Sequence, residues 1–173
     1  MPTLVRNGRV LTLGAALGTA RGTALGAAPA AGGAAAPGAT GTTATGVDFH
    51  TEMTASLNFR RVHTGARLLR LDDRLTAAAQ RHADDLAAHG LVQHDGTDGS
   101  TPWRRLRAAG FAFRFAAEIV APADSVPAAV QLWMNSPQHR DTVLDPRFNH
   151  LGVGHAPGRF GARGRYVLAL AQV

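Results

Sequence analysis

Two histidines and a glutamate in the second half of the chain have residue types that could do chemistry. His94 begins a loop rich in turn residues, Glu118 interrupts an apolar segment, and His139 follows a Ser-Pro pair at which the chain must bend. Two imidazoles and a carboxylate are ligands that a divalent metal such as zinc prefers, and three ligands leave one position for water. Because their spacing is long-range, the sequence also permits three separate polar groups that satisfy loop backbone atoms.

Ser136 lies three residues before His139, a separation at which both side chains share one face of a helical turn. A serine activated by a histidine is the beginning of a nucleophilic dyad. The chain has no Gly-x-Ser-x-Gly elbow and no evident oxyanion loop, which argues against a serine hydrolase. We therefore expect Ser136 to cap the turn that follows it.

Two further polar clusters have simpler explanations. His82, Asp85 and His89 share a helical segment but lack the His-Glu-x-x-His pattern, and a solvated helix face accounts for them. Asp95 and Asp98 lie in a glycine-rich loop without the length and closing glutamate of a calcium loop. Cysteine is absent, which excludes disulfides, cysteine-based zinc sites and thiol catalysis.

The composition fits one soluble globular domain, because 45% of the 173 residues are hydrophobic and 17% are charged. Every basic residue is an arginine, and three of the 18 arginines precede residue 47. The others are interleaved with the 12 acidic residues. This balance is too mild for a nucleic-acid-binding protein, so we expect no nucleic-acid partner.

Residues 1–30 have the organisation of a secretory signal peptide: two arginines, a short apolar run and the small residues Ala28-Pro29-Ala30. A disordered tail is the alternative, because Arg21 lies between the apolar run and the cleavage site. The run is far shorter than the roughly 20 residues that span a bilayer, so we expect no transmembrane segment. Residues 31–46, almost wholly Gly, Ala, Thr and Pro, predict a flexible linker to a domain at 47–173.

Hydrophobic periodicity in the domain predicts four helices and three strands. The helices are expected at 49–64, from Asp72 or Asp73 to Gly90, from Pro102 to Gly110, and from Ser125 through Trp133. The strands are expected at 113–121, around Leu151 and Val153, and from Tyr166 to Leu170, with 157–164 as a hairpin loop. Helices beside an antiparallel sheet of about three strands make an α+β domain. In the first helix, Asn58 and Arg61 fall on or near the apolar stripe, so we expect them to bond a neighbouring loop.

Several short motifs occur together in one order along the domain. They are Leu57-Asn58-x-x-Arg61, Leu71-Asp72-x-x-Leu75-x-x-Ala78-Ala79, His94-Asp95-Gly96, Gly99-Ser100-Thr101-Pro102, Glu118, Trp133-x-x-Ser136-Pro137-x-His139-Arg140 and Gly152-Val153-Gly154. Over residues 49–173 the chain resembles the bacterial CAP superfamily of cysteine-rich secretory, antigen 5 and pathogenesis-related 1 proteins, whose bacterial members are SCP-like extracellular proteins.

The resemblance implies an α-β-α sandwich, with a sheet flanked by about four helices, in an exported protein. It also implies a shallow cavity that two histidines and two acids form in eukaryotic members. The matching positions in this chain are His94, Glu118 and His139, with Ser136 at the fourth. The family's glycines before the glutamate and the second histidine are replaced by Ala117 and Gln138. We expect the fold to tolerate both changes and any metal to bind weakly.

Members of this superfamily are linked to divalent-metal, sterol and fatty-acid binding, and no common catalytic reaction defines them. We therefore predict a secreted, non-catalytic binding module with a lipid or another cell-envelope component as its partner. The alternative is a metal-assisted or Ser/His hydrolase, a peptidase or esterase, that uses the same cavity. An apolar groove for lipid is not recognisable in the sequence, because its residues resemble core residues.

Overall fold

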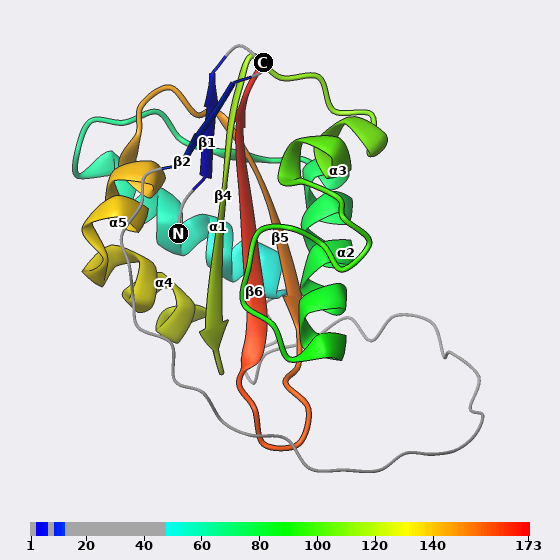
Figure 1. The fold of residues 1–173 in the computed structure, drawn as a ribbon. Helices are drawn as coiled ribbons and strands as arrows, with labels where there is room; N and C mark the ends of the chain where they lie inside the picture. Colours follow the sequence, from blue (N-terminus) through cyan, green and yellow to red (C-terminus); the bar gives the residue numbers. More distant parts are fainter. Residues whose placement is uncertain (1–2, 7–8, 13–47) are drawn as a thin grey trace.

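A long antiparallel strand pair lies at the centre of the fold (Figure 1). The computed structural model describes residues 3–6, 9–12 and 48–173. Its strands are β1 (Thr3–Arg6), β2 (Arg9–Thr12), β3 (Arg70–Leu71), β4 (Phe115–Ala123), β5 (His150–Ala156) and β6 (Gly164–Gln172). β6 pairs antiparallel with β4 on one side and with β5 on the other, and these are the three strands that the sequence predicts.

Three short strands extend the sheet beyond this prediction. β3 pairs parallel with β5 at one edge, and β1 of the β1–β2 hairpin pairs with β4 at the other. The strand order is therefore β2-β1-β4-β6-β5-β3. Both hairpin strands belong to the segment 1–30 that the sequence assigns to a signal peptide. Its cleavage signature, Ala28-Pro29-Ala30, and the predicted linker 31–46 lie outside the described residues.

In the described part of the chain, five helices cover the two faces of the sheet (Figure 1). They are α1 (Phe49–Val62), α2 (Asp73–His89), α3 (Pro102–Ala108), α4 (Val126–Asn135) and α5 (Pro137–Leu144). α2 and α3 lie on one face and the other three on the opposite face, with a cluster of buried apolar side chains beneath each layer. This arrangement confirms the α+β class and the α-β-α sandwich. α5 takes the place of the turn expected after Pro137.

The helix boundaries follow capping residues that the sequence shows. Asp72 precedes α2, and its carboxylate accepts hydrogen bonds from two backbone N–H groups of the first turn. Gly90 ends α2 in the left-handed conformation, with φ of 68°. Thr101 and Ser125 accept a backbone hydrogen bond at the beginning of α3 and α4. These caps determine where the loops on either side of α2 and α3 begin.

Two glycines let β5 approach α2 closely. A Cβ atom built on Gly152 would lie 2.2 Å from the backbone of Leu75, and one on Gly154 would lie 2.3 Å from the backbone of Ala79. Only a residue without a side chain fits at that distance. Because the helix is held directly against the strand, the loop that follows it, including His94, has a defined position.

Asn58 and Arg61 hold α1 against the neighbouring loops. The Asn58 amide donates to Leu69 O at 3.0 Å and accepts from Leu69 N at 2.8 Å. The guanidinium of Arg61 is fully buried and donates to backbone carbonyls of the loop that follows α1, of the last turn of α5 and of the loop after α5. Those carbonyls belong to Arg67, Val143, Asp145 and Phe148. These bonds fix the position of α5, the helix that carries His139.

Candidate functional site

The structure brings two of the predicted cavity residues into direct contact. Glu118 lies on β4 and faces the α2–α3 layer, since Ala116, two residues before it, packs in the cluster on that side. Its Oε1 atom is 3.0 Å from Nδ1 of His94, which lies in the loop between α2 and α3. Only 5% of the Glu118 side chain is exposed. A carboxylate buried to this degree needs compensation of its charge.

Besides His94, Arg105 on α3 compensates that charge. Its Nη2 atom donates to Glu118 Oε2 at 2.8 Å and to His94 O at 2.8 Å. Its Nη1 atom donates to Ser100 O, also at 2.8 Å. Arg105 is itself buried, so the charged pair lies in an environment of low dielectric. One guanidinium therefore joins β4, α3 and both ends of the loop that carries His94.

His82 on α2 completes this cluster. Its Nε2 atom donates to Gln93 O at 3.0 Å and lies 3.7 Å from Glu118 Oε1. The sequence assigns His82 to a solvated helix face, and that assignment is wrong, because only 1% of the residue is exposed. At the surface, Nδ1 of His89 lies 3.1 Å from a carboxylate oxygen of Asp85.

The pKa values of the cluster follow from burial and charge. Burial raises the pKa of Glu118, but the hydrogen bond from His94 and the charge of Arg105 outweigh it and hold this pKa below its usual value. Burial lowers the pKa of His82, although the charge of Glu118 opposes this effect. At neutral pH the cluster therefore contains an ionised carboxylate and a neutral His82.

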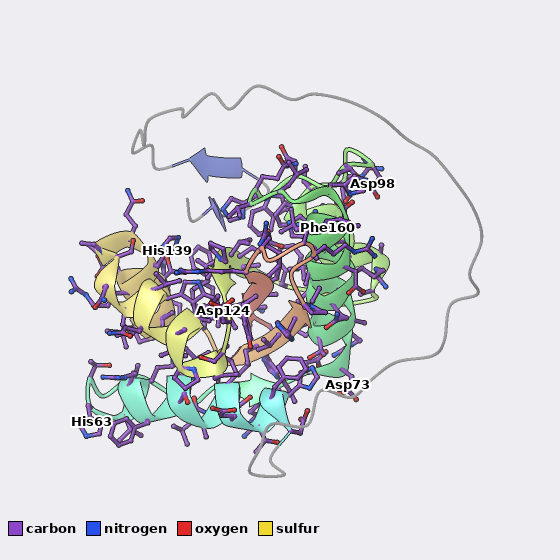
Figure 2. All side chains as sticks on the ribbon, turned by 90° about the horizontal axis from the view of Figure 1, so that it is seen from below. His63, Asp73, Asp98, Asp124, His139 and Phe160 are labelled. Atoms are coloured by element: carbon purple, nitrogen blue, oxygen red, sulfur yellow. The ribbon has the colours of Figure 1, made fainter. Side chains whose placement is uncertain are left out.

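His139 and Ser136 lie on the other side of the sheet, at the junction of α4 and α5; Figure 2 shows His139 on α5. Burial is the largest cause that lowers the pKa of His139 to about 4. The Nε2 atom of His139 is buried and has no hydrogen-bond partner. This imidazole is therefore neutral at physiological pH and lies outside the hydrogen-bonded cluster.

Ser136 occupies the N-cap position of α5 in an extended conformation, as the following proline requires. Its backbone carbonyl accepts from Arg140 N at 2.8 Å, but its side chain makes no capping bond, which contradicts the cap predicted from the sequence. Among the described residues no hydrogen bond joins Ser136 to His139. The serine is therefore not aligned as an activated nucleophile.

A metal ion at the predicted ligands would need a free oxygen of the Glu118 carboxylate. Both of its carboxylate oxygens are engaged, one by His94 and one by Arg105. A cation bound there would lie beside the guanidinium and would be repelled by it. Across the described ranges, no group of three or more His, Asp or Glu side chains is arranged to hold a metal ion. The residues present do not fit the weakly bound divalent metal that the sequence permits.

Sequence reasoning missed two members of the cluster, although the sequence contains a signal for each. Arg105 lies between Trp103 and Leu106, the inward-facing residues of α3, so its position predicts at least partial burial. His82 follows Ala79 by three residues and therefore lies on the apolar stripe of α2. In both cases the charge or polarity of the residue concealed the burial that the helical spacing indicates.

A family model matches residues 55–170, about two thirds of the chain, and it is the model for the cysteine-rich secretory protein family, or CAP. The uncharacterized protein YkwD of Bacillus subtilis is 29% identical over 99 residues, which are 57% of this chain and 38% of that protein. An uncharacterized protein of Borreliella burgdorferi is 27% identical over 84 residues, 49% of this chain and 54% of that protein. The chain thus spans less than two thirds of the length of these relatives.

Solved structures agree with the family match. An extracellular protein with an SCP domain from Bacillus anthracis superposes with a TM-score of 0.63 and 26% identity, covering 72% of this chain and 40% of that one. An outer surface protein from Borrelia burgdorferi has a TM-score of 0.64 and 20% identity, covering 70% and 90%. Because the identity with the Borrelia protein is only 20%, that similarity shows the fold alone. In the residues that the structure describes, every helix is too short or too polar to cross a bilayer.

Proposed function

Because the chain belongs to the cysteine-rich secretory protein family, we propose that it is an extracellular binding module rather than an enzyme. Its N-terminal segment has the organisation of a signal peptide. The similar proteins from Bacillus anthracis and Borrelia burgdorferi are described as extracellular and outer-surface proteins. These features support export. We further propose a lipid or another component of the cell envelope as the partner.

The observation that carries the non-catalytic assignment is the internal satisfaction of the cluster around Glu118. A general acid or base must exchange a proton with substrate, and both oxygens of this buried carboxylate already accept hydrogen bonds within the protein. A nucleophilic serine needs a base within hydrogen-bonding reach, and Ser136 makes no such bond with His139. The cluster therefore acts as a structural support that joins β4, α3 and the loop between α2 and α3.

A turnover assay on the full chain tests this assignment. The parent and His139→Ala are incubated with generic peptide and ester substrates, with and without zinc, and we expect no turnover from either protein. The matched control is His63→Ala, since His63 is an exposed histidine at the end of α1, far from His139 in Figure 2. Turnover that is present in the parent and the control but lost in His139→Ala would establish the rival function, a hydrolase.

A groove between α1 and α4 favours a lipid as the ligand. Its volume is about 750 Å³, and Phe59, Val130 and Met134 contribute apolar surface to it. Phe59 is 62% exposed, which is unusual for a phenylalanine in a helix unless another apolar group covers it. Arg60 also lines the groove and could pair with the carboxylate of a fatty acid.

Binding of a fluorescent fatty acid tests the groove directly. We expect the parent to bind the probe and Met134→Lys to bind it at least tenfold more weakly, because a charge would be buried against the acyl chain. Val92→Lys is the control, since Val92 is half exposed and outside the groove. Equal binding by all three proteins would exclude the groove as the lipid site without affecting the turnover result.

A further inference from the structure

A second pocket, between α2 and α3, lies beside the Glu118 cluster: it shares His82 and Arg105 with the cluster and adds the exposed arginines Arg81 and Arg104. It has a volume of about 560 Å³, within the usual range of small-molecule sites. Arg81 on α2 and Arg104 and Arg105 on α3 contribute guanidinium groups, and Ser100 contributes a hydroxyl. Asp98, labelled in Figure 2, lies on the loop at one end of the pocket. We propose that this pocket binds a phosphate group.

The first support is the availability of two of the arginines. Arg81 and Arg104 are exposed, and in the described part of the chain neither side chain makes an ion pair or a hydrogen bond. By contrast, Arg74 and Arg147 are held by Asp72 and Asp145. Each free guanidinium presents five N–H donors in a planar fork that matches phosphate oxygens. The two forks come from different helices and so approach a ligand from different directions.

The acidic residues of the pocket are bonded to its loop. Asp85 accepts from Thr97 N at 2.9 Å and from Thr97 Oγ1 at 2.5 Å. Asp98 accepts from Ser100 N at 2.8 Å. These carboxylates, together with Glu118 beside Arg105, offset the formal charge of the three arginines. Recognition therefore depends on hydrogen-bond donors at short range rather than on a large net charge.

Arg105 and Ser100, here called the floor of the pocket, carry hydrogen-bond donors that the protein leaves unused. Arg105 is only 7% exposed, and its Nε–H group has no acceptor, although its other nitrogens are engaged. The Ser100 hydroxyl accepts from Arg105 Nη1 at 3.3 Å, which leaves its own O–H free to donate. A carboxylate has two coplanar oxygens, whereas the tetrahedral oxygens of a phosphate group can accept from both walls and the floor. The donor arrangement thus favours phosphate.

Calorimetry on the full chain at low ionic strength tests the proposal, with inorganic pyrophosphate as the probe. We expect one site, and an affinity about tenfold lower for each arginine removed in Arg81→Gln and Arg104→Gln. The double variant Arg70→Gln/Arg114→Gln is the control, because it removes the same charge from exposed positions outside both this pocket and the lipid groove. Circular dichroism verifies that all variants fold.

A second measurement identifies where the phosphate comes from. Sedimentation with phosphatidylglycerol vesicles is compared for the parent, Arg81→Gln/Arg104→Gln and the control. Pyrophosphate binding without vesicle binding supports a soluble phosphate compound, and vesicle binding that only the pocket variant loses supports a lipid headgroup. The proposal is overturned if the parent binds neither probe, or if the control loses binding as much as the pocket variant does. None of these outcomes depends on the turnover or fatty-acid assays.

Discussion

Replacing Arg105 by methionine should destabilise the domain more than any change at an exposed arginine. Methionine has a similar length, so the change removes the guanidinium while keeping much of the packing. It leaves the Glu118 carboxylate buried, with 5% of its side chain exposed and one oxygen without a partner. It also removes donors to the carbonyls of His94 and Ser100.

The expected cost is about 3–5 kcal/mol in the free energy of unfolding at pH 7, the usual result of removing one partner of a buried ion pair. For a domain of this size that corresponds to a lower melting temperature, by on the order of 10–20 °C. In the parent, the pKa of Glu118 is below its ordinary 4.5, so its contribution is present above pH 4.5 and is lost as pH falls through the folded pKa. Without Arg105, burial raises this pKa. The cost of Arg105→Met should therefore shrink as pH falls from 7 to 4.

Urea unfolding followed by circular dichroism measures the effect in a double-mutant cycle. The proteins are the parent, Arg105→Met, Glu118→Gln and the double variant, each at pH 7 and pH 4. We expect the double variant to be at least 1 kcal/mol more stable at pH 7 than the sum of the single changes predicts, because the residues are in contact. A cost of less than about 1 kcal/mol for Arg105→Met, with additive changes, would refute the buried ion pair.

Three other predictions concern Gly154 on β5, the pKa of His139 and the binding of zinc. Gly154→Ala should lower the free energy of unfolding by at least roughly 1–3 kcal/mol, because the new Cβ atom would lie 2.3 Å from the α2 backbone. Urea unfolding measures this change, and an unchanged midpoint would contradict the close contact. NMR titration should give the His139 imidazole a midpoint near pH 4, and a midpoint near 6.5 would show an exposed ring. The free energy of unfolding should decrease as pH falls from 6.5 toward 4, because over this range the imidazole binds a proton in the unfolded state but not in the folded state. Zinc calorimetry should detect no site that His94→Ala or His139→Ala removes, since Arg105 engages Glu118; a single site lost in both variants would show the opposite.

Much of the fold could be predicted because it depends on local patterns. Asp72, Thr101 and Ser125 begin three helices at the expected positions, and the apolar alternation after Gly164 becomes β6. The missed elements are those with weak local signals. α5 is only eight residues long and follows a proline, and β3 is a two-residue strand that exists only because β5 lies beside it.

The sequence by itself determined the layers of the sandwich, the caps of α2, α3 and α4 and the bend at Pro137. Through the family resemblance it also predicted that His94, Glu118, Ser136 and His139 line one cavity. Periodicity and capping are properties of short segments, so they can be seen without coordinates. Only the tertiary structure decided that Arg105 is buried while Arg104 is exposed. It also decided that Arg105 engages the Glu118 carboxylate, on which a metal site would depend, and that His139 stays outside the cluster. Those outcomes depend on which groups from distant segments share one volume of low dielectric, and that is a property of packing rather than of spacing along the chain.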